Sequence, residues 1–324
     1  MERTDFESVV RESLGWSDLS PGHLKKALPR TAKDSSLLAR VATIVRSLPT
    51  DHAMHRADAR DLSCLPDSSV HLVVTSPPYW NLKRYRDVPG QLGHVDDYES
   101  FLDELDKVWA ECHRVLVKGG RLIIVVGDVC LSRRKCGSHS VVPLHASLQE
   151  RCRGIGFDNL APIIWHKIAN ASLEVKNGST FLGKPYEPNS VIKNDIEYIL
   201  MQRKPGGYRK PTHAARVLSV IAEPEFRVWF RQIWELNGAS TRKHPAPYPL
   251  ELAERLVRMF SFVGDTVLDP FAGTATTSLA AARWGRNSVS FEVDHLYAQA
   301  AYKRLLTETQ DLFGNARATL VDSG

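Results

Sequence analysis

The stretch TVLDPFAGTATTSLAAARW, residues 266–284, decides the fold class. It begins with a short apolar run, passes through a turn of small residues, and continues into an alanine-rich segment of helical composition. A buried strand that turns tightly into a helix is the repeating unit of parallel α/β sheets. The sequence therefore predicts a strand over 266–269, a loop, and a helix over 276–284.

Short β-branched apolar runs separated by helical stretches continue this pattern over most of the chain from residue 52. Further strands are predicted for the segment that ends at Asp58 and for HLVVT (71–75), RLIIVV (121–126), LAPIIW (160–165), IEYILM (196–201) and SVSFE (288–292). Residues 98–116 carry apolar side chains at helical spacing, and KGG at 118–120 ends that helix. We expect an α/β fold with a mostly parallel, doubly wound, Rossmann-like sheet.

Three segments break the rhythm of strands and helices. Residues 1–50 read as a helical extension divided by Pro21 and Pro29, whose role is open between packing, self-association and DNA contact. Residues 166–194 and 202–243 are rich in Gly, Pro, Asn and basic residues, and we expect an insertion and a second excursion from the sheet there. The sheet itself is then built from two halves, 51–201 and 244–324.

Composition is that of an ordinary globular protein, with 324 residues of which 43% are hydrophobic and 24% charged. No apolar run approaches the roughly 20 residues of a membrane span, and MERTDFESVV does not resemble a leader, so we expect a cytoplasmic protein. The five cysteines are odd in number and lack C-x-x-C spacing, which predicts reduced thiols, no disulfide framework and no structural zinc.

Positive charge is concentrated in one segment. Residues 203–243 hold nine Lys or Arg against three acids, a net charge of +6, whereas the whole chain has a net charge of +5. Such a concentration is expected where a protein touches a polyanion such as DNA, although a solvated basic face would have the same composition.

The loop after residues 266–269 has the features of a site for a nucleotide-like ligand. Small residues let the backbone approach a ligand, and ligands of open α/β sheets bind beyond the carboxyl ends of strands. Glu292 ends the next strand, where a carboxylate can accept hydrogen bonds from ribose hydroxyls. Asp58 either caps a following helix or contacts the adenine end of the ligand. A Walker lysine and a G-x-G-x-x-G fingerprint are both absent.

A second motif, TSPPYW at 75–80, directly follows the predicted strand HLVVT. Two adjacent prolines lock the backbone, so the carbonyl of Pro77 can be held as a rigid acceptor beside the Ser76 hydroxyl. Together these acceptors can bind both hydrogens of an aromatic NH2 group and direct its lone pair at a methyl donor. Tyr79 offers a face for base stacking and Trp80 a wall, and a base in a duplex must be flipped out to reach them.

Taken together, TSPPYW and DPFAGTATT resemble the signature pair of the amino-methylating DNA methyltransferases, in the permuted class where the catalytic tetrapeptide comes first. The resemblance covers roughly residues 52–305 and implies S-adenosyl-L-methionine as methyl donor, with no metal. It implies a catalytic half at 51–201, a target-recognition region at 202–243 and a cofactor-binding half at 244–324. The implied catalytic residues are Ser76, Pro77, Pro78 and Tyr79.

For the cofactor, the resemblance implies contacts from the loop, the following strand and the HPAPYP segment. These residues are Asp269, Pro270, Phe271, Gly273, Thr274, Glu292 and His244, with Asp58 added from its position. Thr274 and Ala275 depart from the usual Ser-Gly of the family, which leaves the loop shape open. Candidates for DNA contact are Lys83, Arg84, Arg86, Arg209, Lys210, Arg227, Arg231, Arg242 and Lys243.

Serine at position 76 is commoner in the cytosine-N4 enzymes of this family, whereas aspartate marks many adenine-N6 enzymes. We therefore predict methylation of cytosine N4 in double-stranded DNA, with adenine N6 as the alternative. Such enzymes commonly protect host DNA beside a restriction endonuclease, and we expect nucleoid association through DNA. An RNA or protein-amide methyltransferase, usually marked by asparagine at that position, and a non-catalytic nucleic-acid-binding module are the other readings.

Overall fold

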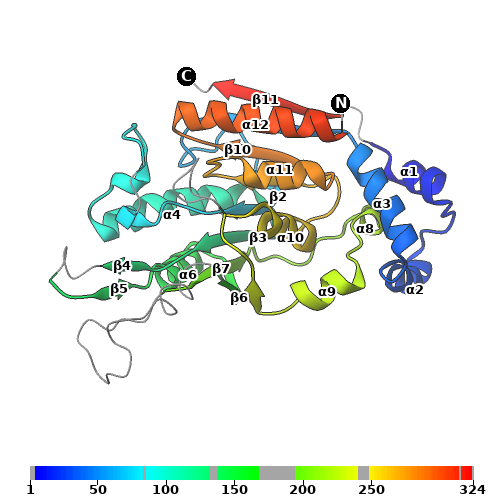
Figure 1. Ribbon diagram of the computed structural model, residues 1–324, viewed down its shortest axis with the longest axis horizontal. Helices are drawn as coiled ribbons and strands as arrows, with labels where there is room; N and C mark the ends of the chain where they lie inside the picture. The colour runs from blue at the N-terminus through cyan, green and yellow to red at the C-terminus, as the bar shows by residue number, and fades with distance from the viewer. Residues whose placement is uncertain are drawn as a thin grey trace, which may run out of the picture.

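A nine-stranded sheet forms the centre of the computed structural model, which describes residues 4–82, 85–131, 137–167, 194–239, 248–313 and 315–322. The strand order is β11-β1-β10-β9-β2-β3-β7-β6-β8 (Figure 1). The strands are β1 (Thr50–Arg56), β2 (Val70–Thr75), β3 (Leu116–Val126), β6 (Asp158–His166), β7 (Ile196–Arg203), β8 (Ile233–Glu235), β9 (Thr266–Asp269), β10 (Asn287–Phe291) and β11 (Ala316–Asp322).

Only β7 runs against its neighbours in this sheet, pairing antiparallel with β3 and with β6. The other pairs are parallel, so the prediction of a mostly parallel Rossmann-like sheet is confirmed. β9 and β2 lie side by side, and the chain leaves β9 toward β10 but leaves β2 toward β3. This divergence is a topological switch point, where ligands of open α/β sheets bind.

Helices cover both faces of the sheet. On one face lie α4 (Tyr98–Val115) and α6 (Leu144–Ile155), packed on alternate residues such as Val73, Ile124 and Leu200. On the other lie α10 (Leu250–Phe260) and α11 (Thr276–Arg283), packed on intervening residues such as Val74 and Ile123. Because both faces are buried, the central strands read as continuous apolar runs. α12 (His295–Phe313) packs beside α11 and β11.

The N-terminal extension forms α1 (Phe6–Leu14), α2 (Pro21–Thr31) and α3 (Ser35–Ser47). Its apolar residues pack against α8 (His213–Leu218), and Phe6 lies against Gly264 just before β9. These contacts lie at the amino ends of the parallel strands, at the right of Figure 1. This extension therefore packs against the main fold. Pro29 was expected to divide a helix, but it lies inside the last turn of α2.

The described part of the basic segment belongs to the main fold. It forms α8, then α9 (Glu223–Trp229), and then β8, which adds a parallel strand beside β6. The sequence indicated an excursion here because β8 is only three residues long and lacks a clear strand pattern. Two further strands, β4 (Val129–Leu131) and β5 (Ser140–Val142), form a separate hairpin, and two short 3-10 helices are η1 (Trp80–Leu82) and η2 (Leu92–His94).

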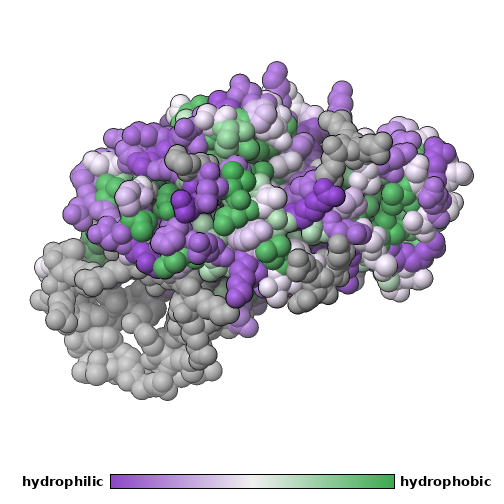
Figure 2. Space-filling view, turned by 90° about the horizontal axis from the view of Figure 1, so that it is seen from above, coloured by the Kyte–Doolittle hydropathy of each residue, from purple (hydrophilic) through white to green (hydrophobic). Residues whose placement is uncertain are grey.

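The face of the molecule that Figure 2 draws is largely polar. Seen from the side of α12 and β11, hydrophobic residues occupy separate smaller areas between hydrophilic ones (Figure 2). In the described ranges, no helix combines the length and apolar composition needed to cross a membrane. Cys64, Cys112, Cys130 and Cys152 are free thiols, and Cys136 lies outside the described residues.

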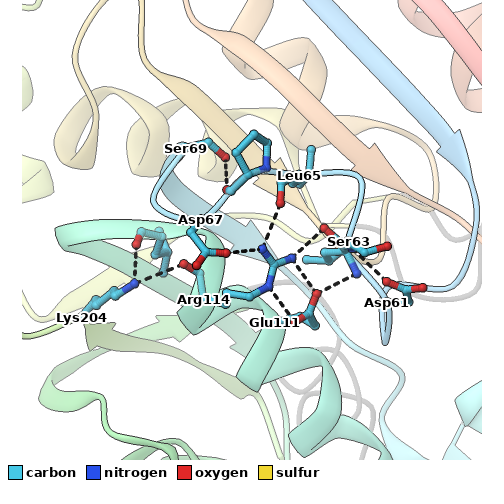
Figure 3. Close-up of polar contacts among 11 residues, drawn as sticks. Asp61, Ser63, Leu65, Asp67, Ser69, Glu111, Arg114 and Lys204 are labelled. Carbon is cyan, nitrogen blue, oxygen red and sulfur yellow. Dashed lines mark hydrogen bonds and ion pairs between the residues drawn. The ribbon is translucent and has the colours of Figure 1, made fainter.

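Arg114, in the last turn of α4, fastens the loop between β1 and β2 (Figure 3). Its guanidinium donates to the carbonyls of Leu62 (2.7 Å) and Leu65 (3.0 Å) and to the carboxylates of Asp67 (2.6 Å) and Glu111 (2.8 Å). One planar cation thus satisfies the Leu65 carbonyl and adds a second donor to the Leu62 carbonyl, which also accepts from the Leu65 amide. This loop begins at Asp58 and supports the edge of the sheet where the site lies.

Replacing Arg114 by leucine should lower the free energy of unfolding by about 1–3 kcal/mol, because the part-buried Leu65 carbonyl and the Glu111 carboxylate each lose a donor. Chemical denaturation measures this change. Arg153→Leu is the matched control, since its ion pair with Glu150 is exposed and surface pairs contribute little. Equal stability of the two variants would contradict the fastening role of Arg114.

Candidate active site

The two predicted loops meet at the switch point. Thr75 ends β2 and Asp269 ends β9, and the Thr75 hydroxyl donates to Asp269 Oδ1 at 2.7 Å. The Asp269 carboxylate also accepts from the Phe271 amide (3.1 Å) and the Tyr248 hydroxyl (3.3 Å). Burial raises the pKa of Asp269, and these hydrogen bonds oppose the rise. Asp269 is only 2% exposed, so it connects the two loops from the interior of the protein.

A cleft of about 570 Å³, its open mouth included, lies in front of this junction. Its size is within the range of small-molecule sites. Seven of the predicted residues line it together, from both halves of the chain: Asp58, Ser76, Pro78, Pro270, Phe271, Gly273 and Glu292. Asp269, Thr274, Pro77 and Tyr79 are not among the lining residues.

Glu292 is the most perturbed carboxyl group in the cleft. Burial raises its pKa to about 7, although hydrogen bonds from the Asp294 and Gly273 amides favour the ionised form. The Gly273 amide reaches Glu292 Oε2 at 2.9 Å, and the Asp294 amide reaches Oε1 at 3.0 Å. These two bonds use half of the roughly four lone-pair sites of a carboxylate, so it can still accept from ligand hydroxyls.

Asp58 also lines the cleft and does not cap a helix. Residues 57–69 form turns, so the helix-cap reading is wrong. The Asp58 carboxylate instead accepts hydrogen bonds from the main-chain amide and the side chain of Arg60. The Arg60 guanidinium also forms an ion pair with Glu104. A Cβ atom at Gly90 would lie 2.8 Å from Asp58 Oδ2, so the close approach of this turn depends on glycine.

The Ser76–Tyr79 turn presents a serine hydroxyl and a proline carbonyl at the carboxyl end of β2. Pro77 and Pro78 are buried, which fixes the turn, and among the described residues no main-chain amide donates to the Pro77 carbonyl. Ser76 is half-buried and lines the cleft. Ser76 therefore lines the cleft directly, and Pro77 lies next to it in the buried turn.

Tyr79 and Trp80 do not form the exposed walls that we expected. The Tyr79 side chain is 6% exposed, and its hydroxyl binds Glu197 Oε2 at 3.0 Å beneath the turn. The Trp80 indole N–H donates to the carbonyls of Val95 (3.0 Å) and Asp96 (3.1 Å), and its ring packs edge-on against Tyr98. Both rings anchor the turn to neighbouring elements because their polar atoms find buried partners there.

The predicted cations are not gathered at the cleft. Arg209 pairs with Asp265 through both terminal nitrogens (2.5 and 2.6 Å) just before β9, at the opposite end of the strands. The prediction that Arg209 contacts DNA is therefore not supported, and its exposed neighbour Lys210 lies at the same end. Arg227 and Arg231 are exposed around α9, Arg227 beside Glu223. Lys83, Arg84, Arg242, Lys243 and His244 lie outside the described residues.

Arg86 lies nearer the cleft than these cations. Its side chain pairs with buried Asp294 at 3.2 Å, two residues after Glu292. This pair holds residues 85–86 close to the cofactor-side wall, where Tyr85 and Tyr297 also line the cleft. A structural role at the cleft is thus observed for Arg86.

Sequence reasoning missed several residues of the site. Gln91 and Leu92 reach the cleft from the segment after the Ser76–Tyr79 turn, and no periodic pattern marks that segment. The Gly127-Asp128 pair after β3 could have been found, because it also stands at a carboxyl strand end. There His145 Nδ1 binds Asp128 Oδ1 at 2.6 Å, and the His145 ring stacks on Tyr198 with centroids 3.8 Å apart.

Three features define the class to which this fold and site belong. They are a mostly parallel sheet, a switch-point cleft, and a carboxylate at the end of the adjoining strand, as in Rossmann-like methyltransferases. Residues 70–303 match the model of a family of N6 and N4 methyltransferases described as DNA methylase. The chain therefore belongs to this DNA methylase family and is a DNA methyltransferase.

Similar proteins agree with this family. The chain is 38% identical over 278 residues to the Type II methyltransferase M.MjaI of Methanocaldococcus jannaschii, covering 76% of this chain and 88% of that protein. It is 36% identical to M.MthZI of Methanothermobacter thermautotrophicus over 282 residues, covering 80% and 77%.

Solved structures share the fold. A crystal structure described as that of a DNA modification methylase from Thermus thermophilus, complexed with S-adenosyl-L-methionine, is 53% identical with a TM-score of 0.69, covering 84% of this chain and 99% of that one. The PvuII cytosine-N4-specific DNA methyltransferase, at 18% identity and a TM-score of 0.58, covers 85% and 96%, and shares the fold.

Replacing Thr75 by valine should destabilise the protein by about 1–3 kcal/mol, because the buried Asp269 carboxylate loses its shortest donor. Thermal and chemical denaturation measure the loss. Thr43→Val, which removes an exposed hydroxyl from α3, should change stability by no more than about 0.5 kcal/mol. Equal stability of both variants would show that the junction does not depend on this bond.

Proposed function

We propose that this protein transfers a methyl group from S-adenosyl-L-methionine to N4 of a cytosine flipped out of double-stranded DNA. One observation carries the proposal: Ser76 and Pro78 line the same cleft as Phe271, Gly273 and Glu292. The amine-binding turn and the cofactor loop are thus adjacent in space, although about 190 residues separate them in the chain.

The cleft fits S-adenosyl-L-methionine on its own chemistry. Glu292 keeps lone pairs for ribose hydroxyls, and Phe271, Phe291 and Tyr297 supply apolar and aromatic surface for an adenine ring. Asp58 faces the same space with its carboxylate shared with Arg60. The cofactor found with the Thermus thermophilus methylase supports this choice. When bound, its sulfonium supplies an activated methyl group.

The residues of the turn contribute orientation. Ser76 Oγ and the Pro77 carbonyl accept the two hydrogens of the exocyclic amine and aim its lone pair along the line of attack. An amine delocalised into its ring gains most from such alignment and from exclusion of water. Once the methyl group has been transferred, the nitrogen loses its extra proton readily, so no strong base is needed.

Serine at position 76 supports cytosine N4 over adenine N6, although both bases present an aromatic amine that two acceptors can hold. We also propose that the protein protects host DNA beside a restriction endonuclease of the same target. Its similarity to two Type II methyltransferases supports that role.

DNA is the proposed macromolecular partner, and its recognition is proposed for the exposed cations rather than for Arg209. Arg227 and Arg231 remain candidates because both side chains reach solvent. The recognition region that the resemblance implies at 202–243 contributes β8 to the main sheet in its described part. Sequence-specific contacts from this region are therefore proposed for side chains on its outer surface.

Replacing Ser76 by alanine should reduce methyl transfer to plasmid DNA at least a hundredfold while leaving the affinity for S-adenosyl-L-methionine unchanged, because one amine acceptor is lost. Radiolabelled cofactor measures transfer, and calorimetry measures binding. Ser47→Ala, which removes an exposed hydroxyl from the last residue of α3, is the control. Normal turnover of Ser76→Ala would refute the acceptor role, and labelling of tRNA or protein in place of DNA would refute the substrate.

Cofactor affinity should depend on pH through Glu292. Its pKa is raised to about 7, so below pH 7 the free protein holds a protonated carboxyl. Ribose hydroxyls that donate to this group favour its ionised form, so affinity should rise up to tenfold per unit as the pH increases toward 7 and then level off. Calorimetry from pH 5.5 to 8.5 measures this dependence. Glu292→Gln should abolish it; a flat wild-type profile would contradict the contact.

A further inference from the structure

A chain of hydrogen bonds runs from the Ser76–Tyr79 turn to the ion pair between Glu197 and Lys167. Ser76 Oγ donates to Tyr79 Oη at 3.3 Å, and Tyr79 Oη donates to Glu197 Oε2 at 3.0 Å. The other carboxylate oxygen, Glu197 Oε1, pairs with Lys167 Nζ. Glu197 stands near the start of β7 with its side chain 13% exposed, whereas the Lys167 side chain is 33% exposed, so the carboxylate is the less accessible member of the pair.

The Glu197 carboxylate at the end of this chain determines which hydroxyl donates in each hydrogen bond. An ionised carboxylate can only accept, so the Tyr79 hydroxyl must donate to Glu197. The carbonyl of Val125, at 3.4 Å, is a second group that can only accept from Tyr79. The Tyr79 hydrogen is therefore committed away from Ser76, and the Tyr79 oxygen is left to accept the Ser76 hydrogen.

This direction matters because a serine hydroxyl is both donor and acceptor. If its hydrogen pointed into the cleft, it would face the hydrogens of the substrate amine and repel them. With its hydrogen on Tyr79, Ser76 presents only lone pairs to the amine. Successive hydrogen bonds in such a chain also polarise one another, so each acceptor becomes stronger.

We propose that Glu197 is a positioning residue that makes Ser76 a pure hydrogen-bond acceptor through Tyr79. This role rests on the proposed function of Ser76 in binding the target amine. It explains why Tyr79 is buried: its hydroxyl, and not its ring face, carries the effect on the substrate.

Neighbouring residues hold this chain in place. Lys167 keeps Glu197 paired and lies over the Trp165 ring, 4.5 Å from its centroid. Gly127, which follows β3, leaves the space that both side chains occupy: a Cβ atom there would lie 3.1 Å from Glu197 Cγ and 3.4 Å from Tyr79 Cε2. The path between the turn and the ion pair is thus tightly packed.

Glu197→Gln tests the direction of the chain. Lys167 should retain the amide oxygen, which turns the amide NH2 toward Tyr79 and removes the strongest acceptor. We expect kcat on plasmid DNA to fall about tenfold, with the dissociation constants for DNA and S-adenosyl-L-methionine unchanged. Glu150→Gln, an exposed pair on α6, is the matched control and should keep wild-type kcat.

A double-mutant cycle with Tyr79→Phe then separates positioning from general support. If Glu197 acts through Tyr79, the single variants and the double variant lose kcat to a similar extent, about tenfold. Multiplied losses, near a hundredfold in the double variant, would overturn the proposal. So would wild-type kcat in Glu197→Gln.

A second variant keeps the test valid if Glu197→Gln folds poorly. Lys167→Met/Glu197→Met removes the acceptor without leaving an unpaired buried charge, and it should show the same loss of kcat. Normal kcat in that variant would also overturn the proposal. Failure of the proposed function looks different, because the wild-type protein would then methylate no DNA or Ser76→Ala would remain active.

Discussion

The hydrogen bond from Thr75 to Asp269 joins the two parts of the site on which everything else depends. It links the carboxyl ends of β2 and β9, neighbours in the sheet that come from opposite ends of the chain. Since both groups are buried, the bond cannot be exchanged for water. The Ser76–Tyr79 turn and the loop after β9 consequently keep a fixed mutual position, which the proposed reaction requires because it depends on orientation.

Much of this arrangement could be predicted because it depends on local pattern. Buried strands that end in unusual turns mark the carboxyl edge of a parallel sheet, so Ser76, Gly273 and Glu292 could be brought together from sequence. Each central strand was found within a few residues of its observed bounds. Chain order did not matter, because adjacency in the sheet and not in sequence creates the cleft.

The parts that could not be predicted depend on tertiary contacts. A tyrosine after two prolines reads as a stacking ring, and only the position of Glu197 on β7 shows that its hydroxyl is buried. Arg209 was predicted to belong to a basic DNA-binding surface, but it forms an ion pair with Asp265 at the amino ends of the strands, away from the cleft. The sequence shows which residues are charged or aromatic but not which residues pair with them in the fold. Roles at the surface, such as DNA contact, were therefore the hardest to predict.

In the function that we propose, the chemistry rests on alignment: the turn accepts an amine, the Glu292 carboxylate binds the methyl donor, and the sheet keeps them together. The central claim is that the amine belongs to cytosine in DNA. Mass spectrometry of nucleosides from plasmid DNA treated with the protein and S-adenosyl-L-methionine tests it most directly. N4-methyldeoxycytidine is the predicted product, whereas N6-methyldeoxyadenosine, or no methylated nucleoside at all, would contradict the claim.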